Sequence, residues 1–465
     1  MVAAGAPKTM AWRGLGAAVA RRGAALRSAV RSHPLAALLV VVAVLGGGLA
    51  RELSIGSNRR VSTDDIGNVK NTNAIITGRP YATFRWPPGT PFVFAVATRL
   101  DGQAELKLRS PSRSPAQYAQ LLLELATLAL IAVVAWSLAG PWAAVIAVVL
   151  AAAYLPLVLI TRTYLSEPLG GLAFLATFAA ALVARRRGFG TAALAGLIAG
   201  LACLAREDVF PAVVLIAAAL AVAGWRASRG QALGRALVYL GCAILVITPW
   251  AIYASGRDGR FVPIVDGGSN ALFIGTYLPG HGKLQPVLNS FRDPVCRAYP
   301  EDCRRYAQLG AAPMFDLVRA RYPHMSAASA IDQAVLDNLD RYALGRPLDF
   351  AGMLLDKLWG MWSYPWSGGN SNGLHPDTSR PQHLIFVGLA WLGLIGGAVV
   401  TRRWSLITVA LGLFGVTFLN VLVNAQGRDN LRLAPLLFAF GGAGLWLLGD
   451  DLWRRLRAAR RPATA

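Results

Sequence analysis

The chain of 465 residues is 55% hydrophobic and only 15% charged, with a formal net charge of +22. An ordinary soluble domain is about 25% charged, so this composition excludes a soluble globular enzyme, a disordered chain and a disulfide-rich secreted module. Arginine supplies 41 of the 46 cations, and many of these arginines flank apolar blocks. We interpret the positive charge as a determinant of membrane orientation and predict no nucleic-acid partner.

The N-terminal segment 1–33 contains Lys8 and several arginines and no acidic residue. Basic segments next to a membrane span usually stay in the cytoplasm, which predicts a basic cytoplasmic tail. A signal peptide is the alternative, because an apolar stretch of suitable length follows the basic segment.

Ten apolar segments follow that approach the length of a membrane-crossing helix, about 20 residues. They are 34–50, 118–138, 142–160, 168–184, 190–205, 209–225, 233–254, 384–401, 404–423 and 432–449. We therefore predict an all-α polytopic membrane protein with about ten transmembrane helices. In this topology the short inner connections carry eight arginines and the short outer ones carry four, which places both termini in the cytoplasm.

This topology also predicts how the chain is divided. The parts are the tail 1–33, a transmembrane region 34–254 that includes the first extracytoplasmic loop 51–117, an extracytoplasmic region 255–383, the C-terminal transmembrane helices 384–449 and a cytoplasmic tail 450–465.

Two segments outside the spans have helical patterns. Residues 66–77 can form a short interfacial helix. Segment 349–362 places six apolar residues on one helical face, which fits a helix that lies along the outer interface or the core helix of a small outer domain. These six residues are Phe350, Met353, Leu354, Leu358, Met361 and Trp362.

The four cysteines fall into two pairs. Cys203 and Cys242 lie in apolar spans, where a cysteine is typically a small packing residue. Cys296 and Cys303 lie in the region 255–383, where an oxidising exterior permits a local disulfide. The sequence leaves open whether that bond forms.

Acidic residues and arginines gather at the predicted outer ends of the spans. The outer groups are Asp64 and Asp65, Glu167, Arg206 with Glu207 and Asp208, and Arg428 with Asp429 and Arg432. Glu124 is the acid that lies inside a span, and we interpret it as the partner of an interfacial arginine or tyrosine. The one-sided distribution differs from that of a transporter, whose charges often lie near the bilayer midplane.

Acids and arginines at one membrane face suit the transfer of a group from a lipid phosphate. Arginine binds phosphate through a planar fork of donors, and a carboxylate can take the proton of an attacking hydroxyl. The alternatives are ordinary ones: an Asp pair often caps a helix or turn, and an arginine near a span end often anchors it.

The order of several motifs resembles the GT-C superfamily of integral-membrane glycosyltransferases, which use polyprenyl-phosphate sugars. The resemblance is greatest to the protein O-mannosyltransferase and lipid A aminoarabinose transferase group. The motifs are Asp64-Asp65 soon after the first span, Gly78-Arg79-Pro80-Tyr81, Pro87-Pro88-Gly89, Tyr164-Leu-Ser-Glu167-Pro168, the Gly-rich span 195–206 and the segment 428–435. The resemblance covers residues 34 to about 260 well and 380–449 loosely.

The resemblance implies roles for individual residues. Asp64 matches the general base, and Glu167 matches a second acid that orients acceptor or sugar. Asp65 is the third catalytic candidate; it stands where a Glu is often found and has a shorter side chain. Arg85, before Pro-Pro, matches the residue that contacts the lipid phosphate. Further candidates for phosphate binding are Arg206 and Arg428; Asp64, Asp65 and Glu167 are the candidates for a divalent metal, which the sequence does not require.

We therefore predict a glycosyltransferase of the bacterial plasma membrane. It would move a sugar from a polyprenyl-phosphate donor to a hydroxyl of a glycan, lipid or protein acceptor on the extracytoplasmic face, with inversion at the anomeric carbon. Two alternatives stay open at this point: a transporter or flippase for lipid-linked or anionic substrates, and a non-catalytic membrane scaffold.

Overall fold

The structure, a computed structural model, describes residues 31–55, 61–108, 113–185, 188–225, 228–298, 300, 312–366, 376–423, 425 and 427–459. The regular elements in these ranges are all helical, and none is a strand. Eight of the helical segments are long and apolar enough to cross a membrane. The prediction of an all-α polytopic membrane protein is therefore confirmed. Most of the tail 1–33 lies outside the described residues.

The ten predicted spans correspond to long or apolar helices. They are α2 (Pro34–Ser54), α5 (Pro115–Ala139), α6 (Pro141–Ala153), α8 (Glu167–Arg185), α9 (Phe189–Ala205), α10 (Phe210–Gly224), α11 (Arg229–Asp258), α18 (Pro376–Thr401), α19 (Trp404–Val423) and α20 (Ala434–Ala459). Of these, α6 and α9 are shorter than a full span. The first turn η1 (Glu207–Val209) extends α10 to spanning length.

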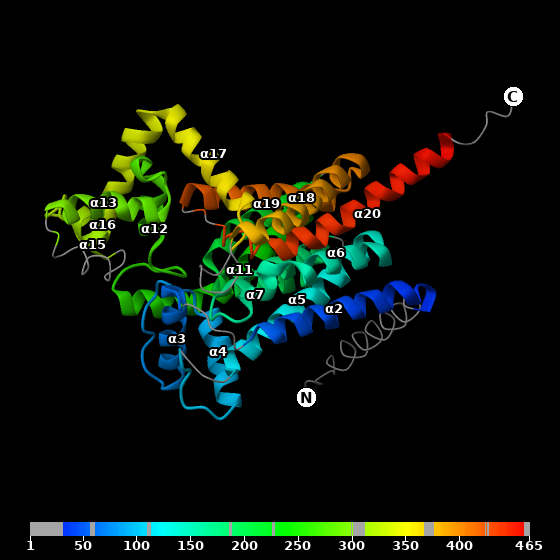
Figure 1. Cartoon of the computed structure of the whole chain (residues 1–465), viewed down its shortest axis with the longest axis horizontal. Coiled ribbons are helices and arrows are strands. Elements are labelled where there is room, and N and C mark those ends of the chain that lie inside the picture. Colours follow the sequence, from blue (N-terminus) through cyan, green and yellow to red (C-terminus); the bar gives the residue numbers. More distant parts are fainter. Residues whose placement is uncertain are drawn as a thin grey trace, which may run out of the picture.

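The remaining helices lie outside the main spans. They are α3 (Thr63–Ile76), α4 (Gly89–Leu100), α7 (Leu155–Ile160), α12 (Gly268–Thr276), η2 (Leu278–Gly280), α13 (Leu284–Ala298), α15 (Ala312–Arg319), α16 (Ala327–Asn338), η4 (Leu339–Leu344) and α17 (Pro347–Ser363). Helices α3, α4 and α12 to α17 lie at one end of the bundle, while the start of α2 and the end of α20 lie at the other (Figure 1).

Small residues let the spans pack closely. Helix α9 packs against α11, where a Cβ at Gly196 would lie 2.2 Å from the carbonyl oxygen of Tyr239. Helix α18 packs against α20 in the same way, because a Cβ at Gly393 would lie 2.1 Å from the carbonyl oxygen of Gly441. Such contacts supply the van der Waals packing that holds membrane helices together.

One predicted span is not continuous. The segment 142–160 divides at Tyr154 into α6 and α7, with Pro156 in the first turn of α7. The backbone groups exposed by the break are satisfied from α18: Gln382 Nε2 donates to the Ala153 carbonyl at 2.8 Å, and its Oε1 accepts from the Leu155 amide at 3.2 Å. The prediction of a single helix here was wrong because a side chain distant in sequence replaces the helical hydrogen bonds.

The acid inside a span has the expected partner. Glu124 of α5 is 1% exposed, and its Oε2 accepts from Nη2 of Arg51 in α2 at 3.1 Å. Arg51 is fully buried and also donates to three backbone carbonyls, those of Gly47, Ala151 and Ala152. The interpretation of Glu124 as the partner of an arginine is confirmed.

The helices α12 to α16 have a core of their own, built from Phe273, Val287, Met314, Ile331 and further apolar residues. Helix α17 connects this group to the bundle and packs against α19. Its predicted apolar face is only partly buried, because Leu358 is 38% exposed and Lys357 lies on the buried side. The Lys357 ammonium donates to the carbonyls of Gly275 and Val423 at 3.0 and 3.3 Å.

Cys296 is disulfide-bonded. The other cysteine of the predicted pair, Cys303, lies outside the described residues. Cys203 and Cys242 carry free thiols in the spans, and Cys203 belongs to the main core.

Candidate active site

Asp64 is placed by the start of α3. Ser62 caps this helix, which begins three residues before the predicted interfacial helix 66–77. One carboxylate oxygen of Asp64 accepts a hydrogen bond from the Trp86 indole at 3.1 Å. The indole lies directly over Gly67, where a Cβ would come within 2.4 Å of the ring. The glycine one turn after Asp64 therefore makes room for the ring that binds Asp64.

Asp65 faces a different direction from Asp64. Its Oδ2 accepts from the amide and hydroxyl of Ser62 at 2.8 and 2.7 Å, which completes a capping box. Its Oδ1 accepts from the backbone amide of Tyr164 at 2.7 Å. Asp65 is thus buried and connects α3 to the segment that leads into α8. It holds these two segments in place relative to one another.

Glu167 begins α8, with Pro168 at the position that a helix start favours. Its carboxylate is 2% exposed, and Oε1 lies 3.0 Å from Nε of Arg428. Nη1 of Arg428 lies 2.6 Å from Oδ2 of Asp64, so one guanidinium joins two acids that are 103 residues apart. The second oxygen, Oε2, is buried and accepts no hydrogen bond from the described residues.

Arg206 lies on the other side of Glu167. It forms a fork with Asp208, at 3.2 and 3.3 Å, and its Nη1 donates to Ser166 at 2.7 Å and lies 3.5 Å from Glu167 Oε1. The arginine crosses α8 at Gly170, where a Cβ would lie 2.4 Å from its Cδ. A larger residue at 170 would displace the guanidinium.

Two more residues complete a chain of alternating charges. Arg432 lies 2.5 Å from Asp208 and 2.6 Å from Asp429. We call the seven groups the charged cluster: Asp64, Arg428, Glu167, Arg206, Asp208, Arg432 and Asp429. The side chains of Asp64 and Arg428 are 29% and 27% exposed and those of the other five range from 2% to 19%, so a substrate would meet the cluster at Asp64 and Arg428.

The electrostatic balance at Asp64 keeps it ionised. Burial by itself raises its pKa, but the charge of Arg428 and hydrogen bonds from Arg428 and Trp86 outweigh burial. The pKa of Asp64 is therefore below its ordinary value.

The structure brings Asp64, Glu167, Arg206 and Arg428 together, and it leaves Arg85 apart from these contacts. Arg85 is exposed, one residue before Trp86, and its backbone amide bonds to Thr83. Four residues were not predicted as site residues. They are three members of the charged cluster, Asp208, Asp429 and Arg432, and Trp86, which hydrogen-bonds to Asp64. These residues lie close in sequence to predicted site residues. Their contacts, however, join segments that are far apart in the chain, so the sequence did not indicate them.

The acids of the cluster do not fit a metal ion in this arrangement. Among the described residues no three His, Cys, Asp or Glu side chains gather as a metal site. Asp65 is turned to Ser62 and Tyr164, and the Arg428 guanidinium lies between Asp64 and Glu167. Arginine, rather than a shared cation, balances these two carboxylates.

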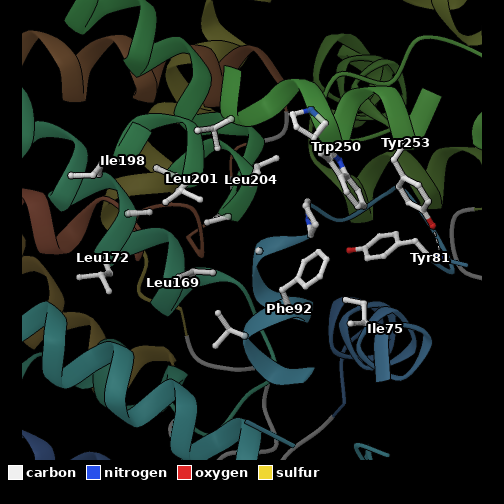
Figure 2. Close-up of a pocket in the computed structure, with 18 of the residues that line it drawn as sticks. Ile75, Tyr81, Phe92, Leu169, Leu172, Ile198, Leu201, Leu204, Trp250 and Tyr253 are labelled. Carbon is white, nitrogen blue, oxygen red and sulfur yellow. Dashed lines mark hydrogen bonds between the residues drawn. The ribbon is translucent and has the colours of Figure 1, made fainter. Parts of the chain in front are cut away.

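An apolar groove of about 800 Å³ lies along helices that also carry residues of the charged cluster. It is lined by residues of α4, α8, α9 and α11, among them Phe92, Leu172, Leu201 and Trp250 (Figure 2). Its wall also includes Leu169, two residues after Glu167, and Ala205, next to Arg206. The groove can hold a hydrocarbon chain whose polar end lies at the cluster.

The chain is similar in structure to proteins of known structure. One is the archaeal oligosaccharyltransferase AglB from Archaeoglobus fulgidus, in complex with an inhibitory peptide and a dolichol-phosphate: identity is 14%, coverage is 94% of this chain and 53% of that chain, and the TM-score is 0.54. The apo form of the A. fulgidus oligosaccharyltransferase gives the same identity and TM-score, with 92% and 52% coverage. ArnT from Cupriavidus metallidurans, bound to undecaprenyl phosphate, is 16% identical with 90% and 78% coverage and a TM-score of 0.39.

The chain spans about half the length of the oligosaccharyltransferase. No protein-family model matches it, and no curated protein matches its sequence. The helices of this chain are arranged as in the oligosaccharyltransferase, which is a likeness of fold.

Proposed function

We propose that the chain is a membrane glycosyltransferase that moves a sugar from a polyprenyl-phosphate donor to an acceptor hydroxyl. The observation that carries this proposal is the meeting of an ionised Asp64, a pair of arginines and a long apolar groove at one place. A lipid phosphate needs this combination, because its chain is apolar and its head is anionic. The related fold of an oligosaccharyltransferase solved with a dolichol-phosphate supports the same donor class.

The lipid would bind with its chain in the groove and its phosphate at Arg428. In the structure Arg428 is held by Asp64, which keeps the pKa of Asp64 low and makes this carboxylate a weak base. A phosphate is a strong competitor for a guanidinium. Once Arg428 turns to the phosphate, the pKa of Asp64 rises, so donor binding would itself release the base.

Transfer would then occur in a single displacement. The acceptor oxygen attacks C1 of the sugar, its proton passes to Asp64, and the bond between C1 and the phosphate oxygen breaks. The lipid phosphate leaves with its charge balanced by Arg428, with Arg206 nearby. A displacement of this kind inverts the configuration at C1. The Oε2 of Glu167, buried and without a hydrogen-bond donor among the described residues, would accept a hydrogen bond from a hydroxyl of the sugar or acceptor once Arg428 has moved. Exposed Arg85 would add a phosphate contact.

We further propose that this face is extracytoplasmic in a bacterial plasma membrane. The described connections at the opposite end of the bundle carry arginines, among them Arg229, Arg235, Arg402 and Arg403, which is typical of the cytoplasmic side. The region 268–363 would then lie outside the cell, beside the site, where it can contact an acceptor.

The test is incubation of purified protein with a panel of polyprenyl-phosphate sugars, followed by mass spectrometry for transfer or hydrolysis. Asp64→Asn should lower the rate by about 10²- to 10⁴-fold, while Asp101→Asn, an exposed acid at the same end, should not. Full activity of folded Asp64→Asn would remove Asp64 from the reaction. Exchange of the lipid across vesicles without a covalent product would instead support a flippase.

A further inference from the structure

A second apolar cavity lies at the end of the bundle away from the charged cluster. It has a volume of about 260 Å³ and lies between α8, α10 and α19, with Phe178, Ile216, Ala219, Trp404 and Thr408 in its wall. Helix α8 runs from Glu167 to Arg185, and a helix of 19 residues is roughly 27 Å long. The cavity is therefore a separate feature from the groove that Leu169, Leu172 and Ala173 of α8 line near Glu167.

The cavity opens to the hydrocarbon of the membrane and contains one polar group that lacks a partner. Three of its apolar residues are 42%, 63% and 64% exposed: Leu215, Val222 and Leu411. The hydroxyl oxygen of Thr408 is buried and makes no hydrogen bond with the described residues. A hydrocarbon chain can enter from the bilayer, and a chain that carries an ester oxygen would satisfy this hydroxyl.

Positive charge lies at the mouth of the cavity. A narrow extension shares the five wall residues named above and reaches Arg185 at the end of α8. The Arg185 guanidinium lies 5.5 Å from the centre of the Trp404 ring. Arg402 is exposed in the turn before α19, two residues before Trp404. No acidic residue lines either part of the cavity as described, so the mouth favours an anion.

We propose that this cavity binds one anionic glycerophospholipid from the adjacent leaflet. One acyl chain would lie between α8, α10 and α19, an ester oxygen would accept a hydrogen bond from Thr408, and the phosphate would lie beside Arg185. A bound chain would fill the space between three helices, two of which lead to the charged cluster at their other ends.

The test is native mass spectrometry of the delipidated full chain, titrated with phosphatidylglycerol or phosphatidylcholine of identical acyl chains. We expect one phosphatidylglycerol to bind at least about tenfold more tightly than phosphatidylcholine. Equal affinity for the two lipids would overturn the anionic headgroup, and a polyprenyl-phosphate adduct that Ala219→Phe abolishes would overturn the diacyl lipid.

Matched variants locate the lipid. Ala219→Phe fills the cavity and should abolish the adduct, whereas Val214→Phe, at an exposed site of the same helix outside the cavity, should not. Arg185→Ala should remove the preference for phosphatidylglycerol. Its control is Arg229→Ala, since Arg229 also lies over an indole, that of Trp225, but does not line the cavity. An adduct that persists in folded Ala219→Phe with unchanged affinity would overturn the proposal.

Discussion

The two ends of the membrane bundle use arginine in different ways. In the charged cluster three arginines alternate with four carboxylates, and most of these side chains are buried. At the opposite end arginines lie over indole rings instead: Arg185 over Trp404, Arg229 over Trp225 and Arg457 over Trp453. Such arginines anchor a helix at the membrane surface. Two further arginines at that end pair with acids, but these pairs, Arg454–Asp450 and Arg455–Asp451, lie at the surface and within one helix. An arginine at a span end therefore points to chemistry only where buried acids from other segments accompany it.

The buried ion pair of Arg51 and Glu124 gives the largest expected effect on stability. Replacing one member should lower the unfolding free energy more than any other proposed substitution. Glu124→Ala leaves the guanidinium of Arg51 buried without its acid. We expect a loss of about 3–5 kcal/mol in unfolding free energy, measured by denaturation in detergent. The double variant Arg51→Met/Glu124→Leu should recover most of this loss. Equal destabilisation of single and double variants would show that packing, rather than charge, is responsible.

Arg428→Gln tests the end of the bundle that contains the charged cluster. It removes the cation between Asp64 and Glu167 and should lower the rate of transfer by about 10²- to 10³-fold. Arg229→Gln at the other end should leave the rate unchanged. A folded Arg428→Gln protein with a rate within threefold of the wild type would show that Arg428 only anchors the chain.

Gly67→Ala, beside Asp64 at the same end of the bundle, should lower the rate of transfer less than Arg428→Gln does. The added Cβ would meet the Trp86 ring at 2.4 Å and displace the indole from Asp64. Overpacking of this kind costs about 1–3 kcal/mol, and the rate of transfer should fall with it. Gly241→Ala, in a helix with open space at this position, should be neutral or slightly stabilising. Equal behaviour of the two variants in thermal unfolding would contradict the proposed contact.

The smallest expected effect is a change in the stability of the fold with pH, caused by the ionisation of Asp64. Because the pKa of folded Asp64 is below its ordinary value of 3.8, its ion pair stabilises the fold fully above about pH 5 and less as the pH falls through the folded pKa. The difference in Tm between wild type and Asp64→Asn should therefore shrink from pH 6 to pH 3. A constant difference would mean that ionisation of Asp64 does not stabilise the fold.

The spans and four of the seven members of the charged cluster could be predicted from the sequence. Apolar length is a local property, so hydropathy located all ten helices, and charges at span ends singled out Asp64, Glu167, Arg206 and Arg428. The break at Tyr154 could not be predicted, because Gln382 supports it from 227 residues away.

Which partner each acidic side chain would meet could not be predicted, because it depends on the direction in which that side chain points. Asp64 and Asp65 are neighbours in sequence, but successive helical residues face different ways, so one meets Arg428 and the other meets Ser62 and Tyr164. The contact of Trp86 with Gly67 likewise depends on how the Pro-rich turn folds back over α3.

The double role of Asp65 has a consequence for how the sequence around the charged cluster can change. By capping α3 and holding the Tyr164 amide, Asp65 ties the helix that carries Asp64 to the segment that leads to Glu167. None of the charged cluster comes from 268–363. The charged cluster is thus built without the outer helices, and these helices can change in sequence without altering the spacing of the acids.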